Sequence, residues 1–218
     1  NRLAGQSTVF EQAYVTQPVC TPSRSSLLTG LYPHTSGCTE NNLPLPEEVP
    51  TLAEMLSDDY VTAYHGKWHL GDEIFAQHGF EEWRSIEDGY SRYYRPGRDP
   101  ETRSTYHQWL IGQGLEPARG ETFGRDESAR LPEAYGKPAY LAHEASRFIR
   151  ERSEHPDQPF MLLVNFLEPH PPYFSPWDDM YSADEVGLPE NFEVDEEEKA
   201  GWSKRHEAFW RFYHEVGH

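Results

Sequence analysis

Cysteine and lysine are both scarce in this chain of 218 residues, which contains two cysteines and four lysines. Cys20 and Cys38 are too few to form a disulfide framework. The mean hydropathy is −0.83, and no apolar run approaches the roughly 18–20 residues that a membrane-spanning helix needs. The sequence therefore excludes a disulfide-stapled scaffold and a transmembrane helix.

Basic residues are also few: the chain has 19, against 37 acidic residues, and its net charge is −18. Such a field repels phosphate backbones, so we expect no nucleic-acid partner. The 36% hydrophobic and 14% aromatic content is enough for the core of about one domain. The chain starts at Asn1 without a signal-peptide pattern and reads as helix toward its end, so we expect an interior segment, and we leave its localisation open.

Helical and strand patterns alternate along the chain, which is typical of an α/β fold. Residues 84–138, rich in Arg, Glu, Gly and Pro, read as an irregular insertion. In the predicted helix over 139–152, one face carries Leu141, Ala145, Phe148 and Ile149. The remaining predicted elements are strands at 8–15 and 60–64, a fully buried strand at 160–166, helices at 22–28 and 51–56, an acidic helix start at 195–198 and a helix from 203.

The first motif that carries chemistry is Cys20-Thr21-Pro22-Ser23-Arg24, followed by Leu28-Thr29-Gly30. It places a thiol at a helix N-terminus, where free backbone N–H groups stabilise an anion. A cysteine alone is more often a small buried hydrophobe. A thiolate phosphatase is excluded, since its arginine would follow the cysteine by six residues rather than four.

Two further motifs follow predicted strands. In Gly66-Lys67-Trp68-His69-Leu70-Gly71, the side chains of Lys67 and His69 share one face of an extended segment while Trp68 faces away. His170 lies in Glu168-Pro169-His170-Pro171-Pro172, after the strand at 160–166. Open α/β sheets bind ligands at such strand ends. The alternatives are a solvated surface lysine and a histidine that only caps a strand.

Together, the three motifs resemble those of the type I, formylglycine-dependent sulfatases of the alkaline-phosphatase-like superfamily. The resemblance implies a sheet with helices on both faces. Residues 1–218 would be part of the N-terminal catalytic domain, truncated at both ends and incomplete as a sheet. We expect such a segment to be inactive by itself.

The resemblance also implies a mechanism for hydrolysis of a sulfate monoester. A maturation enzyme would convert Cys20 to formylglycine, whose hydrated gem-diol attacks sulfur. Arg24 would hold the gem-diol, His69 would orient or deprotonate it, and Lys67 and His170 would clamp the sulfate or protonate the leaving oxygen.

The implied cofactor is calcium, or alternatively magnesium or manganese. Cys20, as formylglycine, would be one ligand, and the resemblance places the remaining Asp and Asn ligands outside this segment. Two adjacent acidic pairs, Asp58-Asp59 and Asp178-Asp179, read as solvated turns.

Two other functions remain open: a phosphonate monoester or phosphodiester hydrolase of the same superfamily, and a non-catalytic binding protein on this scaffold. The substrate would be a small-molecule or saccharide sulfate ester, with a slight preference for a small one. Asn41 and Asn42 follow the first motif closely enough to contact the ester. A cationic, aromatic wall over the site is a further hypothesis, against a solvated insertion; its members would be Tyr90, Arg92, Tyr93, Tyr94, Arg95, Arg98 and Arg103.

Overall fold

The structure is a computed structural model that describes residues 2–182 and 184–187. Residues 1–168 form one compact unit and residues 169–218 a second, and each is described by itself. Among the described residues, no helix combines the length and the apolar character needed to cross a bilayer. The expected helix start at 195–198 and helix from 203 lie outside the described residues.

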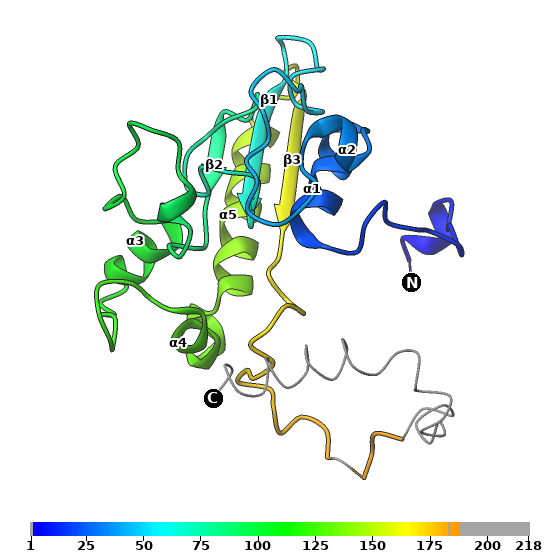
Figure 1. Ribbon diagram of the computed structural model, residues 1–218. Helices are drawn as coiled ribbons and strands as arrows, with labels where there is room; N and C mark the ends of the chain where they lie inside the picture. The colour runs from blue at the N-terminus through cyan, green and yellow to red at the C-terminus, as the bar shows by residue number, and fades with distance from the viewer. Residues whose placement is uncertain (1, 183, 188–218) are drawn as a thin grey trace, which may run out of the picture. The chain divides into compact units, whose positions relative to one another are not determined.

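A three-stranded parallel sheet organises the first unit (Figure 1), in the order β2-β1-β3. β1 (Val61–Gly66) is central and pairs with β2 (Glu82–Arg84) and β3 (Phe160–Asn165). The strands predicted at 60–64 and 160–166 are thus confirmed. The expectation that the second is fully buried is wrong, because β3 is half-buried and Phe160 is 40% exposed. Among the described strands, β3 pairs only with β1, so its other side has no neighbour. The strand that is buried is β1, which lies between β2 and β3.

The two faces of the sheet carry separate hydrophobic clusters. On one face, Tyr64 of β1 meets Leu28 of α1 (Cys20–Thr29), and Leu163 of β3 packs against them. On the other face, Val164 of β3 packs against a cluster that includes Leu141 of α5 (Lys137–Ser153). Neighbouring residues of a strand point to opposite faces, so Leu163 and Val164 serve different clusters. Helices therefore cover both faces, as expected.

Helix α5 confirms the predicted helix over 139–152 and extends it at both ends. Pro138 lies in its first turn, where the missing N–H is not needed. Phe148 is buried, whereas Ile149 is 49% exposed. The expectation that Ile149 faces the core is wrong, because about 100° of helical rotation separates it from Phe148.

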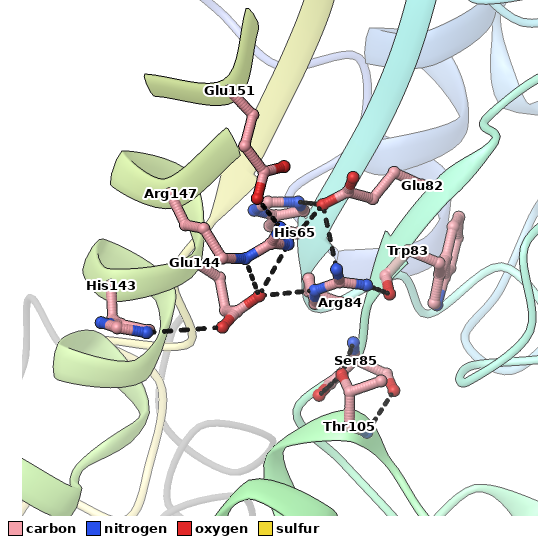
Figure 2. Close-up of polar contacts among 10 residues, drawn as sticks. All are labelled: His65, Glu82, Trp83, Arg84, Ser85, Thr105, His143, Glu144, Arg147 and Glu151. Carbon is pink, nitrogen blue, oxygen red and sulfur yellow. Dashed lines mark hydrogen bonds and ion pairs between the residues drawn. The ribbon is translucent and has the colours of Figure 1, made fainter. Parts of the chain in front are cut away.

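An ion-pair network fastens α5 to the sheet (Figure 2). The Arg147 guanidinium lies 3.0 Å from Glu82 of β2, and the Arg84 Nε lies 2.6 Å from Glu144 of α5. The ring of His65, on β1, packs edge-on against Phe148 beneath these charges. The network fixes the rotation of α5 about its axis, so the apolar stripe stays on the sheet.

Two predicted elements, the strand at 8–15 and the helix at 51–56, are absent from the structure at those residues. The apolar residues of the strand expected at 8–15 are exposed, with Phe10 at 78% and Tyr14 at 87%, and the segment pairs with no described strand. Alternation without a pairing partner does not make a strand. The helix expected at 51–56 is instead a series of turns. Its proposed cap, Thr51, donates its hydroxyl to the carbonyl of His78 2.8 Å away, so that hydroxyl does not cap a helix.

Helix α1 confirms the helix predicted over 22–28 and starts two residues earlier, at Cys20. A four-residue helix, α2 (Pro33–Ser36), contacts it. Residues 84–138 hold α3 (Thr105–Gly112) and α4 (Arg125–Arg130), and α3 places Tyr106 and Leu110 in the second core cluster. Three single-turn 3-10 helices complete the described elements: Ala4–Gln6, Ser91–Tyr93 and Glu133–Tyr135.

Candidate active site

Cys20 is the first residue of α1, is half-buried and takes part in no disulfide. The residue before the helix, Val19, supplies no capping side chain. Asn41, which is distant in the sequence, caps the helix instead: its Oδ1 accepts a hydrogen bond of 3.0 Å from the backbone N–H of Thr21. The N-terminus of α1 is therefore anchored, and the side chain at position 20 is held in a defined place.

The second motif continues directly from the end of β1. Gly66 has a φ of +113°, and a Cβ at this position would lie 1.9 Å from the carbonyl oxygen of Asn165 in β3. The next backbone N–H, of Lys67, donates to that same oxygen over 3.2 Å. Glycine is thus required where the two parallel strands approach each other, and this close contact sets the course of the loop that follows.

Side chains alternate along this loop as the sequence predicts. Trp68 is fully buried in the first core cluster, where its ring lies edge-on to Tyr64 with centroids 5.0 Å apart. Lys67 and His69 are buried to 2% and 7% exposure, and both interact electrostatically with Cys20. The structure therefore brings these two side chains together with Cys20.

Three hydrogen bonds hold His69, whose φ of +59° is uncommon for a residue with a side chain. Its N–H donates to the Glu73 carboxylate over 2.6 Å, and its carbonyl accepts from the Thr21 hydroxyl over 2.7 Å. The Nε2 lies 2.9 Å from the Asn42 Oδ1, and the Asn42 N–H donates to the Thr21 hydroxyl over 3.2 Å. Thr21 and Asn42 thus tie this loop to the N-terminus of α1.

Arg24 lies one turn after Cys20 and also contacts the loop. Its Nη1 donates to the carbonyl of Lys67 over 2.7 Å, and the hydroxyl of Tyr64 donates to the same oxygen over 2.6 Å. Arg24 therefore fixes the backbone beside Cys20.

The site favours a neutral histidine and a lysine whose charge is only partly compensated. Burial lowers the pKa of His69, against an opposing hydrogen bond with Cys20. Because the Asn42 Oδ1 only accepts, the His69 Nε2 carries the proton and Nδ1 keeps its lone pair. Burial, followed by repulsion from Arg125, lowers the pKa of Lys67. Attraction by Glu87 and Cys20 opposes this lowering.

Glu73 is a functional candidate that sequence reasoning missed. Its carboxylate accepts the N–H groups of Trp68 over 2.9 Å and His69 over 2.6 Å. Burial raises its pKa to about 7, despite these two hydrogen bonds. An acidic residue within six positions of the lysine motif is the one sequence signal for it, and such residues are abundant in this chain.

The range 84–138 adds a second group of residues, of which the sequence analysis named only Tyr90. The Tyr90 ring lies 4.8 Å from the His69 ring, and its hydroxyl is 2.7 Å from the Arg125 Nη2. Arg125 and Lys137 both bind the buried carboxylate of Glu87. Tyr90, a member of the expected cationic wall, thus lies next to His69. Three arginines of that wall pair with acids instead: Arg95 with Glu47, Arg98 with Asp72, and Arg103 with Glu101 and Glu121.

His170 belongs to the second unit and is described separately. Its Nδ1 lies 2.8 Å from the carbonyl oxygen of Pro171, and its expected role toward the sulfate stays a prediction. Asn41 and Asn42 bind Thr21 and His69, and their expected contact with the ester also stays a prediction.

The acidic pairs at 58–59 and 178–179 lie in exposed turns, as expected. Among residues 2–182 and 184–187, no group of three or more His, Cys, Asp or Glu side chains is placed to hold a metal ion. These residues therefore do not fit the ligand set of the implied divalent cation by themselves.

The geometry places the buried side chains of Lys67 and His69, in the loop after the central strand β1, beside the thiol of Cys20 at the N-terminus of α1. A family model described as Sulfatase matches residues 1–207. The chain belongs to the sulfatase family.

The curated relatives of this chain are longer sulfatases. It is 30% identical over 202 residues to an ulvan-active sulfatase of Formosa agariphila, which covers 87% of this chain and 34% of that protein. It is 30% identical over 178 residues to a choline-sulfatase of Rhizobium meliloti, covering 78% of this chain and 33% of that protein. The chain thus spans about a third of the length of these relatives.

A solved structure supports the fold. A phosphonate monoester hydrolase from Silicibacter pomeroyi superposes with a TM-score of 0.59 at 18% identity, over 86% of this chain and 40% of that one. At this identity the likeness concerns the fold alone, and it confirms the expected alkaline-phosphatase-like α/β architecture.

Proposed function

We propose that the protein hydrolyses a sulfate monoester to an alcohol and inorganic sulfate. The observation that carries this proposal is the amino group of Lys67, which is buried at 2% exposure beside Cys20 and is repelled by Arg125. A buried positive charge is costly unless anions compensate it fully, and a bound sulfate would add that compensation. Membership of the sulfatase family points to the same anion.

Each residue around Cys20 has a task in this reaction. A maturation enzyme converts Cys20 to formylglycine, and addition of water to the aldehyde gives a gem-diol whose hydroxyl is the nucleophile. The anchored start of α1 provides a fixed position for it. His69, neutral with its Nδ1 lone pair available, accepts the proton of that hydroxyl. Lys67 neutralises the sulfate oxygens as charge develops, and Arg24 holds the Lys67 carbonyl so that the ammonium stays in place. We assign His170 to the leaving oxygen on the sequence motif alone.

The family resemblance implies calcium, with magnesium or manganese as alternatives. Converted Cys20 is the one ligand that we propose within this chain. Because the described residues do not form a metal site by themselves, none of the steps above is assigned to the ion.

The substrate class is a sulfate ester of either a saccharide or a small alcohol. The relatives include an ulvan-active sulfatase and a choline-sulfatase, whose names cover both kinds of substrate. The side-chain oxygens of Asn41 and Asn42 already bind Thr21 and His69. Both residues would contact the ester only through atoms that these hydrogen bonds leave available.

The test uses the protein at its natural length, coexpressed with a formylglycine-generating enzyme, and 4-nitrophenyl sulfate as the probe. Lys67→Met removes one preorganised donor and should lower kcat about 10²–10³-fold. Arg150→Gln, on the exposed face of α5, is the matched control and should leave kcat unchanged. Faster hydrolysis of 4-nitrophenyl phenylphosphonate than of the sulfate would favour the phosphonate alternative. Binding of sulfate without turnover of either ester would favour the non-catalytic one.

A further inference from the structure

Next to the proposed sulfate site lies a cluster of charges that the proposed reaction does not use. Lys137 Nζ binds the Glu87 Oε1 at 2.7 Å, and Arg125 binds both oxygens of the same carboxylate. Two cations share one anion, so the cluster is positive. Lys67 and Arg24 add to this charge, in a chain whose net charge is −18. A local excess of cations in an otherwise acidic protein favours an anionic ligand.

The guanidinium of Arg125 is held rigidly at Nε and Nη2, and its Nη1 group is left over. Its Nε lies 3.0 Å from each oxygen of Glu87, and its Nη2 binds both Glu87 and the Tyr90 hydroxyl. Its Nη1 makes no hydrogen bond to any residue that the structure describes, and the side chain is 32% exposed. A guanidinium fixed in this way loses little entropy when it binds a planar anion.

Tyr90 connects this guanidinium to the residues around Cys20. Its ring packs against the ring of His69 at 4.8 Å, while its hydroxyl meets Arg125 at 2.7 Å. Arg125 also repels Lys67, and after burial this repulsion is the largest influence that lowers the pKa of that lysine. An anion on the substrate close to both would relieve this repulsion.

We infer that Arg125, positioned by Glu87 and Tyr90, binds a second anionic group on the alcohol part of the sulfate ester. The inference rests on the proposed function, because it takes the sulfate to lie at Lys67. The second group is a carboxylate or another sulfate, both of which accept charge-assisted N–H hydrogen bonds. The preferred substrate is thus at least doubly charged.

The test measures binding in a Cys20→Ala background, so that it does not depend on turnover. Calorimetry compares 4-carboxyphenyl sulfate with its uncharged counterpart, 4-carbamoylphenyl sulfate, and 1,4-phenylene bis-sulfate serves as the arm for a second sulfate. Arg125→Gln should weaken binding of the doubly charged esters about tenfold or more, and leave the carbamoyl ester within about twofold. The arm with the larger loss identifies the second group.

Two matched variants separate recognition from structure. Arg98→Gln removes the same charge from an ion pair with Asp72 and should affect the charged and uncharged esters equally. Tyr90→Phe keeps the charge of Arg125 but removes one of its fixings, and should give a smaller loss confined to the doubly charged esters. This variant also carries the test if Arg125→Gln does not fold.

Equal losses for all three esters in Arg125→Gln and in Tyr90→Phe would overturn the inference. Release of sulfate from the carbamoyl ester by the matured protein tests the proposed function separately. If the protein hydrolyses the carbamoyl ester but Arg125→Gln weakens binding of all three esters equally, the proposed function stands and the inference about Arg125 is wrong.

Discussion

The buried carboxylate of Glu87 offers a quantitative test of the electrostatics described here. Although burial raises its pKa, Lys137 and Arg125 lower it from 4.5 to about 2. With 1.36 kcal/mol per pKa unit, this shift corresponds to about 3 kcal/mol of folding stability. The side chain is 3% exposed, so solvent screening removes little of it. Since the folded-state pKa is depressed, this stability is present above pH 4.5 and is lost as the pH falls toward 2.

The assay is urea unfolding, followed by tryptophan fluorescence, for the wild-type protein and Glu87→Gln at several pH values. At pH 7 the variant leaves two cations without their shared anion, which costs about 3–5 kcal/mol. The difference between the two proteins should shrink by about 3 kcal/mol between pH 5 and pH 2, because Glu87 becomes neutral in the wild type.

The matched control is Glu101→Gln, which removes an acid from an ion pair with Arg103. Glu101 is 71% exposed, so its loss should cost less than about 1 kcal/mol at any pH. A wild-type advantage over Glu87→Gln that is the same at pH 7 and pH 2 would refute the reasoning, because the carboxylate would then stabilise the fold without its charge.

Three further predictions concern the loop and the nucleophile. Burial raises the pKa of Glu73 from 4.5 to about 7, so its contribution to stability falls as the pH rises through that window. Glu73→Gln should remove this fall in the same unfolding series and lower kcat, because one loop hydrogen bond is lost. Thr21→Val, which keeps the shape but loses the hydroxyl between His69 and Asn42, should cost about 1–3 kcal/mol; an unchanged unfolding midpoint would contradict it. Mass spectrometry of the matured protein should find the peptide with Cys20 lighter by the exchange of sulfur for an aldehyde oxygen, and only unmodified thiol in an active sample would disprove it.

The central strand and the main helix were predictable because their patterns are local. Val61–Gly66 is an apolar segment that ends in glycine, and Lys137–Ser153 carries an amphipathic stripe. The strand expected at 8–15 failed for a non-local reason. Alternation describes one side of a pairing, and nothing in those eight residues specifies a partner strand.

The residues of the candidate site also divide into those that local sequence predicts and those that depend on distant partners. Cys20, Lys67 and His69 lie in compact motifs whose spacing fixes which way they point, and the structure brings them together. Glu73, Arg125 and Glu87 act through partners far away in the sequence: Glu87 meets Arg125 across 38 residues and Lys137 across 50. A single arginine among fifteen carries no mark of such a partner, so only the three-dimensional structure identifies it.

The contact of Gly66 with the Asn165 carbonyl has a consequence for protein engineering. A Cβ at position 66 would overlap backbone rather than a movable side chain, so no rotamer change can make room for it. Gly30 is also in the left-handed region, with a φ of +71°, but has open space around it. In a library randomised at both positions, folded clones should therefore keep glycine at 66 and accept asparagine at 30. Attempts to alter the specificity of this site should accordingly vary the side chains facing it, such as Tyr90, and leave residue 66 fixed.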